Sequence, residues 1–262
     1  MKPTEQTRGR IALVTGAATG IGAAITERLA LQGMDLVLVA RDAARLESVA
    51  KRLHTDYSTA VLTVPMDLSQ EGAPGRLAER LAGDGIEVDV LVNNAGASLV
   101  GPVAASDPAR VRALVDLNAG AVAELTTLML PAMVARGRGS IVNIASTGAY
   151  APAAYLAAYA ASKAFVLAFT QAVWAETRGT GVRVVAVSPG PTDTPMNTRP
   201  VPGKRRPGDV ADTVMAALRG NAPSFVDGRG NAVQTFVLGR LLSSRTAVRI
   251  SERFMRKAAV SH

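Results

Sequence analysis

Short apolar runs alternate along the chain with longer stretches of helical periodicity. The runs are residues 11–15, 36–40, 61–64, 88–92, 140–145 and 182–188. Most are continuous rather than alternating, which is typical of strands buried on both faces. The helical stretches are residues 21–32, 43–53, 75–82, 108–136 and 154–177. This series predicts an α/β fold, with one parallel sheet, right-handed crossovers and helices on both faces of the sheet.

Two later regions depart from the alternation. Residues 195–207 are rich in proline and basic residues and predict a loop that could border the substrate. Residues 224–228 fit a short seventh strand, and 232–242 and 246–257 fit two amphipathic helices. We find no sequence repeat and no low-complexity linker, so residues 1–262 are interpreted as a single domain in which 229–262 form a helical extension.

The composition excludes several classes of protein. With 48% hydrophobic and 19% charged residues, the 262-residue chain can bury a large core and is not expected to be disordered. No apolar run reaches the roughly 18 to 20 residues that span a bilayer, and the polar first ten residues do not resemble a signal peptide. The absence of cysteine excludes disulfides and thiolate metal sites, so we expect a cytoplasmic protein without a metal centre.

The net charge of +8 has several interpretations. It can reflect an arginine-rich composition alone, or a nucleic acid, membrane or acidic ligand as partner. Aromatic residues make up only 4% of the chain, which leaves few platforms for stacking on bases. We therefore expect no nucleic-acid partner.

A glycine-rich segment lies between the first predicted strand and the first predicted helix. It reads Thr-Gly-Ala-Ala-Thr-Gly-Ile-Gly over residues 15–22. Its glycines permit a tight turn and a close approach of the backbone to a pyrophosphate, and the helix that follows offers free N–H groups to the phosphates. An ordinary glycine-rich turn is the alternative, but the position between strand and helix favours a dinucleotide site.

One tyrosine has a lysine one helical turn away. Reduction of a ketone needs a hydride on carbon and a proton on oxygen, and a phenol with a pKa of ~10 donates that proton better when a nearby cation lowers the pKa. Tyr159 and Lys163 have this i, i+4 spacing, whereas Tyr57, Tyr150 and Tyr155 have no lysine there. We expect the ammonium to lie near the phenol and to lower its pKa; a solvated surface pair is the alternative.

Two further polar residues are candidates for the same chemistry. Ser146 follows the fifth strand, where open α/β sheets bind ligands, and its hydroxyl can donate to a substrate oxygen. A capping role is the alternative for Ser146, and Thr147 is the competing hydroxyl. Asn118 is a polar residue of low helix propensity inside a predicted helix; a buried asparagine bound only to backbone is its alternative.

Taken together, these segments resemble the short-chain dehydrogenase/reductase family. The resemblance rests on the TGxxxGIG loop, Asn93-Asn94-Ala95-Gly96, Pro189-Gly190, and Asn118, Ser146, Tyr159 and Lys163, and it covers roughly residues 10–227. It implies a Rossmann-type, doubly wound parallel sheet of seven strands with those last four residues as the catalytic set. In this family the lysine also holds the nicotinamide ribose, and the asparagine anchors a water that relays protons.

The resemblance also implies a set of cofactor-binding positions. These are Gly16, Ala18, Thr19, Gly20, Ile21, Gly22, Arg41, Asp67, Leu68, Asn94, Ala95, Gly96, Tyr159, Lys163, Pro189, Gly190, Thr192 and Thr194. Within the set, Asp67 resembles the acid that contacts the adenine.

The end of the second strand indicates which nicotinamide cofactor binds. NAD enzymes place an acid there for the ribose 2′-hydroxyl, whereas this chain has Ala40 followed by Arg41. A guanidinium suits the 2′-phosphate of NADP(H). Asp35 begins the strand, ~16 Å from the cofactor edge at 3.3 Å per residue, and Asp42 is expected to cap the next helix. A surface arginine is the alternative for Arg41.

The sequence therefore predicts an NADPH-dependent ketoreductase acting on a carbonyl/alcohol pair. The alternatives are an alcohol or hydroxysteroid-type dehydrogenase running in oxidation, and a catalytically silent NADP-binding sensor. Residues 97–105 and 147–158 are small and apolar, which favours a hydrophobic substrate. Met196 and the run Lys204-Arg205-Arg206 add the expectation of an acidic group on it.

Residues 229–262 carry seven basic residues against one acid, Glu252, a local net charge of +6. We expect residues 232–257 to bury their apolar positions on their own or a neighbouring subunit beside the substrate cleft. A peripheral contact with an anionic membrane is the alternative. The extension makes the family's tetramer doubtful. We expect a homo-oligomer, as a dimer through the helices 108–136 and 154–177 rather than a tetramer.

Overall fold

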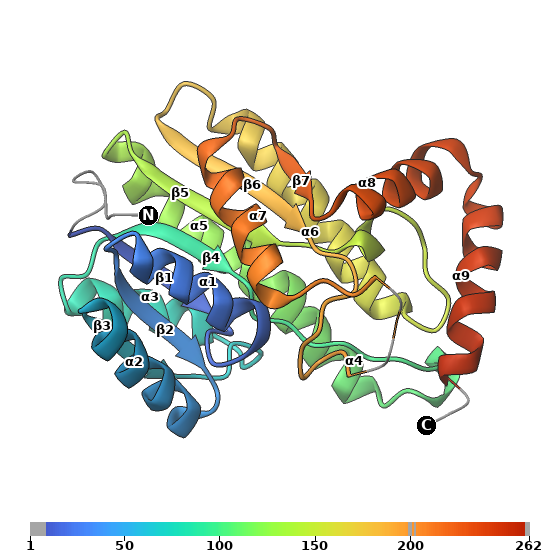
Figure 1. Ribbon diagram of the computed structural model, residues 1–262, viewed down its shortest axis with the longest axis horizontal. Helices are drawn as coiled ribbons and strands as arrows, with labels where there is room; N and C mark the ends of the chain where they lie inside the picture. Colours follow the sequence, from blue (N-terminus) through green and yellow to red (C-terminus); the bar gives the residue numbers. More distant parts are fainter. Residues whose placement is uncertain (1–8, 199–200, 202, 260–262) are drawn as a thin grey trace.

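Seven parallel strands form one sheet in the order β3-β2-β1-β4-β5-β6-β7 (Figure 1). The computed structural model describes residues 9–198, 201 and 203–259. The strands are β1 Ile11–Thr15, β2 Asp35–Ala40, β3 Val61–Pro65, β4 Val88–Asn93, β5 Gly139–Ile144, β6 Val182–Ser188 and β7 Ser224–Val226. The strand order reverses between β1 and β4, and ligands bind at such a reversal beyond the carboxyl ends of the strands. The predicted doubly wound α/β fold is confirmed.

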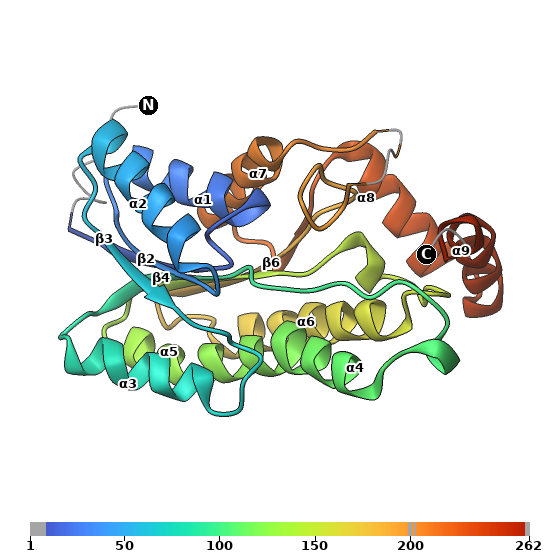
Figure 2. The same ribbon diagram turned by 90° about the horizontal axis from the view of Figure 1, so that it is seen from below.

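Helices cover both faces of this sheet (Figure 2). One face carries α1 Gly20–Leu31, α2 Ala43–Tyr57 and α7 Pro207–Arg219, and the other carries α3 Ala73–Gly83, α4 Pro108–Val115, α5 Ala121–Ala135 and α6 Ala157–Glu176. Successive strand residues point to opposite faces, so Val14 belongs to the core under α1 while its neighbour Leu13 belongs to the core under α3 and α5. Burial on both faces is why the strands are apolar without alternation.

Helix α7 is the one element of this layer that the sequence analysis missed. Residues 195–207 were expected as a loop, and the Pro207 that ends this run is in fact the first residue of the helix. A proline at that position is compatible with a helix because the first N–H groups have no partner within it. Val210 and Val214 lie fully buried, four residues apart, and attach α7 to the sheet.

The predicted helix 108–136 is continuous but contains a π-helical turn, Asp116–Gly120, between α4 and α5. The extra residue of this turn brings Asn118 inward, where it is fully buried. By length and composition alone, Pro108–Ala135 could cross a bilayer, since an 18-residue window within it has a mean hydropathy of 1.3. Its buried residues Leu114 and Leu125 belong to the protein core, so we assign it to the layer that covers the sheet.

The chain ends in α8 Arg229–Phe236, a π-helical turn Val237–Leu241 and α9 Ser244–Ala259. Both helices lie at one end of the molecule, beyond β7 (Figure 1). The backbone N–H of Ala154 donates to the Ser251 hydroxyl over 3.1 Å, so α9 packs on its own chain beside the segment 147–158.

The turn between α6 and β6 supports a prediction about stability. Gly179 and Gly181 both have positive φ, +82° and +78°; a Cβ on Gly181 would lie 2.0 Å from the Gly137 carbonyl oxygen, while one on Gly179 would meet nothing within 4 Å. Alanine at either site costs about 1 to 2 kcal/mol for the left-handed backbone. We expect Gly181→Ala to cost about 1 to 3 kcal/mol more because the backbone must shift. Urea unfolding measures both free energies, and equal losses would contradict this packing.

Candidate active site

The carboxyl ends of β1 and β4 are locked together by side chain–backbone hydrogen bonds. The Thr15 hydroxyl accepts the N–H groups of Asn94 at 3.0 Å and Ala95 at 2.9 Å. In return, the Asn94 amide donates to the Thr15 carbonyl at 2.9 Å and to the Gly16 carbonyl at 3.3 Å. These bonds fix the segment that follows β4 against the glycine loop, so both lie at the strand-order reversal.

The glycines of the loop are required by close contact between segments. Gly16 has φ +66°, and a Cβ there would lie 2.8 Å from the Asn94 side-chain nitrogen. A Cβ on Gly22 would lie 2.2 Å from the Gly16 carbonyl oxygen, and one on Gly20 3.1 Å from the Thr194 side chain. The loop therefore contacts both the β4 segment and the segment that follows β6, as a site built from several strand ends requires.

The N-terminus of α1 fits an anionic ligand. Thr19 occupies the N-cap position without a side-chain cap, and the first turn holds no acidic residue. Within the described chain, the N–H groups of Gly20, Ile21 and Gly22 have no hydrogen-bond partner. Free amides at the positive end of a helix bind phosphate, so this terminus would hold the pyrophosphate of a dinucleotide. Ala18 packs against the core directly before it.

Arg41 lies directly after β2, exposed, and it forms no ion pair within the described residues. Two acids near this strand could have indicated NAD instead of NADP(H), but neither is placed to bind the ribose. Asp35 pairs with Ile11 at the opposite end of the strand, and Asp42 accepts the N–H of Arg45 at 3.0 Å as the cap of α2. The guanidinium of Arg41 is therefore available for a ligand phosphate.

The residues that follow β3 are ordered by a local turn. One carboxylate oxygen of Asp67 accepts both the backbone N–H of Ser69 at 3.0 Å and its hydroxyl at 2.7 Å. Leu68 is buried in the core between them. The turn holds the Asp67 carboxyl in place after β3, the position that the resemblance gives to the adenine contact.

Asn118 binds the backbone of the segment that follows β4. Its side-chain oxygen accepts the Ala97 N–H at 2.8 Å, and its amide donates to the Ala97 carbonyl at 2.9 Å and to the Ser162 hydroxyl at 3.1 Å. A Cβ on Gly96 would lie 3.2 Å from the Asn118 oxygen and 3.6 Å from the Lys163 nitrogen. Asn118 thus has the backbone partners expected of a buried structural asparagine, and it also lies beside Lys163.

Lys163 is almost fully buried, with 5% of its surface exposed. Its ammonium donates to the Ile144 carbonyl at the end of β5 over 2.8 Å. Burial disfavours the charged form and lowers the pKa of Lys163 to about 8. A lysine with this pKa changes its charge near neutral pH.

Tyr159 and Ser146 face one another at the end of β5. The Ser146 oxygen and a ring carbon of Tyr159 lie 3.5 and 3.7 Å from the place of a Cβ on Gly148. Burial raises the pKa of Tyr159, and its hydrogen bond with Ser146 acts in the opposite direction. The expected lowering of this pKa by Lys163 is therefore wrong for the protein alone, since desolvation of the phenol dominates and the ammonium is held by β5.

Ser146 also has the capping role that was the alternative to a catalytic one. Its hydroxyl accepts the Gly148 N–H at 3.0 Å and so begins the short 3₁₀ turn Thr147–Ala149. This bond uses a lone pair of the oxygen and leaves its proton free to point at Tyr159 or at a substrate oxygen. Capping and chemistry are compatible at this residue.

The segment after β6 closes the site and includes a contact that the sequence did not predict. The Pro189 carbonyl accepts the Thr147 N–H at 2.9 Å, and the Thr192 hydroxyl donates to the Gly190 carbonyl at 2.9 Å. A Cβ on Gly190 would lie 2.3 Å from the amide nitrogen of Asn231 in α8. The helical extension therefore packs directly on a predicted cofactor-binding residue.

Each residue of the basic run in the loop pairs with an acid of its own chain, which weakens the reason to expect an acidic group on the substrate. Lys204 pairs with Asp193 at 3.3 Å and Arg206 with Asp209 at 3.1 Å. Arg205 pairs at 2.9 Å with Asp227, which is fully buried. These pairs explain the run as structural: Arg205 ties the loop to the end of β7.

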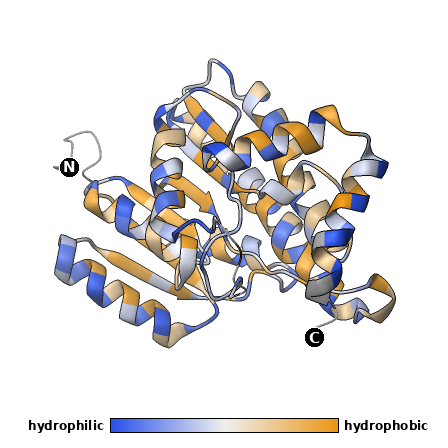
Figure 3. Cartoon of the chain, turned by 45° about the vertical axis from the view of Figure 1, so that its right-hand side comes forward, coloured by the Kyte–Doolittle hydropathy of each residue, from blue (hydrophilic) through white to orange (hydrophobic). Residues whose placement is uncertain are grey.

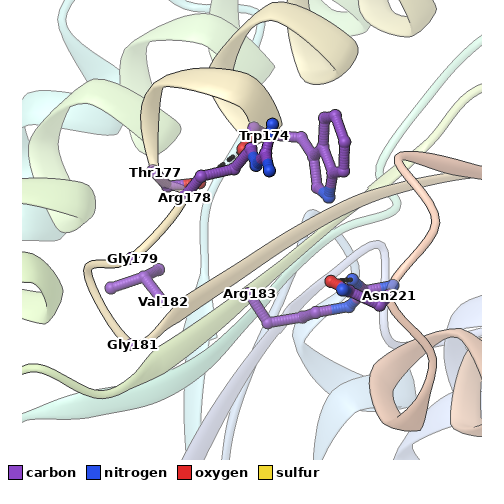
Figure 4. Close-up of a pocket in the computed structure, with 8 residues that line it drawn as sticks. All are labelled: Trp174, Thr177, Arg178, Gly179, Gly181, Val182, Arg183 and Asn221. Atoms are coloured by element: carbon purple, nitrogen blue, oxygen red, sulfur yellow. Dashed lines mark hydrogen bonds between the residues drawn. The ribbon is translucent and has the colours of Figure 1, made fainter.

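A pocket at the amino-terminal edge of the sheet lies away from this site (Figure 4). No acid lines this pocket, and its one hydroxyl residue, Thr177, has no base beside it. Arg178 lies over the Trp174 ring, with its guanidinium carbon 5.8 Å from the ring centroid. The lining residues are Trp174, Thr177, Arg178, Gly179, Gly181, Val182, Arg183 and Asn221. The predicted catalytic and cofactor-binding residues lie instead at the carboxyl edge.

Comparisons with known proteins identify relatives of this chain. An uncharacterized oxidoreductase of Staphylococcus saprophyticus is 36% identical over 221 residues, 83% of this chain and 94% of that protein. A very-long-chain 3-oxoacyl-CoA reductase of Bos taurus is 35% identical over 185 residues, 69% of this chain and 59% of that protein.

A solved structure shows the same architecture. The short-chain dehydrogenase from Sphingobium yanoikuyae in complex with NADPH is 32% identical, with a TM-score of 0.81 over 87% of this chain and 92% of that chain. The family model described as short chain dehydrogenase matches residues 10–204, which include the glycine loop, Ser146, Tyr159 and Lys163. The chain belongs to the short-chain dehydrogenase/reductase family and is an oxidoreductase.

Proposed function

We propose that the protein is an NADPH-dependent ketoreductase in which Tyr159 is the general acid. The observation that carries this proposal is the position of the Tyr159 phenol, beside the Ser146 hydroxyl and one helical turn before the buried Lys163. Bound NADPH would supply the hydride to the substrate carbon. The same residues run the reverse reaction, so an alcohol dehydrogenase working in oxidation is the alternative.

Each side chain has a defined part in the proton transfer. Tyr159 donates its phenolic proton to the carbonyl oxygen, and Ser146 donates a hydrogen bond to the same oxygen. Burial keeps Tyr159 protonated at neutral pH, the form in which a general acid acts. The hydrogen bond from Ser146, which lowers the pKa of Tyr159, stabilises the phenolate that remains, and the charge of Lys163 would hold the nicotinamide ribose. Asn118 holds the segment of Gly96 and Ala97 beside Lys163.

The proposed substrate is a hydrophobic carbonyl compound. Two apolar side chains near the site are strongly exposed: Val103 at 66%, in the segment between β4 and α4, and Met196 at 55%, in the loop after β6. The bovine relative is named as a reductase of very-long-chain 3-oxoacyl-CoA, a substrate with a long apolar chain. Both observations favour an apolar ketone or 3-oxoacyl compound over a small polar one.

Arg41 is proposed to set the preference for NADP(H), in agreement with the NADPH bound in the Sphingobium structure. Arg41→Ala should weaken NADPH binding about ten- to a hundredfold through the lost phosphate contact, with NADH binding nearly unchanged. Arg45→Ala is the matched control, because Arg45 is an exposed arginine on the same helix start that pairs with Asp42. Fluorescence titration with both cofactors measures this, and an equal loss for NADPH and NADH would reject the assignment.

Lys163 should give the enzyme a pH dependence. With a pKa of about 8, its side chain is an ammonium below that pH and neutral above it. Because the charged form supports cofactor binding and catalysis, kcat/KM for NADPH should fall as the pH rises through about 8. In Lys163→Arg the charge persists and the profile should stay level there, at a lower rate. A wild-type profile that stays level through this range would contradict the role of Lys163.

Tyr159→Phe should abolish turnover while NADPH binding persists, because the variant lacks the proton donor but keeps the ring. Tyr57→Phe, far from the site on α2, is the control and should keep the wild-type rate. Turnover is followed at the absorbance of the reduced nicotinamide, and binding by titration. Near-normal turnover in Tyr159→Phe would reject the proposed general acid.

A further inference from the structure

The two C-terminal helices have an inner face that packs on the active-site segments. On α8, Asn231 lies against Gly190 and Thr235 is only 4% exposed. In the turn that follows, a Cβ on Gly239 would lie 2.8 Å from the Tyr150 carbonyl oxygen. These three residues recur every four positions, so they form one stripe along the helix. The opposite face of α8 is turned away from the protein.

That opposite face of α8 is apolar and exposed. Val233 and Phe236 of α8 are 64% and 59% exposed, and Leu241 of the following π-helical turn is 64% exposed; Arg229 and Arg240 of the same segment are exposed as well. We call Val233, Phe236 and Leu241 the outer apolar patch. Three large apolar side chains exposed together are unusual for a soluble surface and mark an interaction site.

Helix α9 presents a stripe of arginines beside this patch. Its inner side holds Ala247, 3% exposed, and Ser251, which binds the Ala154 N–H. The opposite side holds exposed arginines that recur every four positions and so share one face. This arginine stripe consists of Arg245, Arg249 and Arg253. Among the described residues, none of these three pairs with an acid, whereas Arg256 hydrogen-bonds Tyr155 and pairs with Glu252 at 2.9 Å.

We propose that the outer apolar patch and the arginine stripe together dock this protein on the surface of an anionic lipid bilayer. Both helices lie at the same end of the molecule, and both alternate hydrophobic and hydrophilic segments (Figure 3). Basic residues bind anionic headgroups, and apolar side chains of an amphipathic helix enter the boundary with the acyl chains. A lipid surface uses both features at once.

Other occupants use only half of this surface. A second copy of the chain, paired symmetrically, would bring two arginine stripes together. Nucleic acid would pair with the arginines but leave the outer apolar patch in water. A different apolar surface fits the expected subunit contact: Leu128 and Val134 of α5 and Phe165 of α6 are 42%, 38% and 45% exposed.

Docking would also bring the active site close to the lipid. The inner faces of α8 and α9 contact Tyr150 and Ala154, in the segment that leads to Tyr159. One helix, about 10 Å across, then separates that segment from the bilayer. This consequence rests on the proposed function, because it would suit a hydrophobic substrate that partitions into lipid; the docking itself is tested without turnover.

The test is sedimentation of the full-length protein with vesicles. Vesicles of phosphatidylcholine alone are compared with an equal mixture of phosphatidylcholine and phosphatidylglycerol. We expect binding to the mixed vesicles and little to the neutral ones. The double charge reversal Arg245→Glu and Arg249→Glu in the stripe should lower the partition at least about tenfold, since each basic residue contributes roughly fivefold. Phe236→Ser, and separately Val233→Ser, should each lower it severalfold.

A matched control separates the stripe from the overall charge. Lys51→Glu with Arg219→Glu changes the net charge equally at exposed sites on α2 and α7, and the partition should fall less than the stripe variant's. Circular dichroism and thermal unfolding confirm that each variant is folded.

Four results would overturn the proposal. The first is no binding of the wild type to the mixed vesicles, and the second is an equal loss of binding in the control. The third is full binding by both serine variants, which indicates a general site for polyanions. The fourth is a smaller assembly mass for the serine variants in sedimentation velocity, which indicates that a second copy covers the patch.

Discussion

The active site depends on the hydrogen bond from the Lys163 ammonium to the Ile144 carbonyl. It joins the first turns of α6 to the end of β5, in a setting where an unpaired ammonium would be strongly unfavourable. Because α6 is fixed at this point, Tyr159 one turn earlier meets Ser146 at the end of the same strand. Lys163 therefore fixes the position of Tyr159 relative to Ser146, and it also supplies a positive charge to the site.

Buried polar pairs extend this anchoring into the protein. The Asn93 amide donates to the Asn143 side-chain oxygen over 2.9 Å, which joins β4 to β5, and the Asn143 amide donates to Thr170 of α6 over 2.9 Å. Asn118 adds the π-helical turn before α5 through Ala97 and Ser162. These bonds fix one relative position of strands and helices, although the buried side-chain oxygen of Asn93 has no partner within the described residues.

Much of this organisation was predictable from the sequence because it is local. Continuous apolar runs mark strands buried on both faces, and Tyr159 is the tyrosine with a lysine one turn later. Features that depend on distant contacts were not predictable. Arg205 looked like a ligand for an acidic substrate until Asp227 was found beside it, and the pKa of Tyr159 follows burial rather than spacing. Helix α7 was hidden by the proline that begins it.

The central claim is that this site moves a hydride and a proton onto a carbonyl group. The most direct measurement uses NADPH carrying deuterium at the transferable position of the nicotinamide, with a panel of apolar ketones and 3-oxoacyl thioesters. The account predicts that at least one member forms an alcohol with deuterium on the carbinol carbon and one NADP⁺ per alcohol. Tight NADPH binding without deuterium transfer to any member would contradict it and would favour a cofactor-binding sensor.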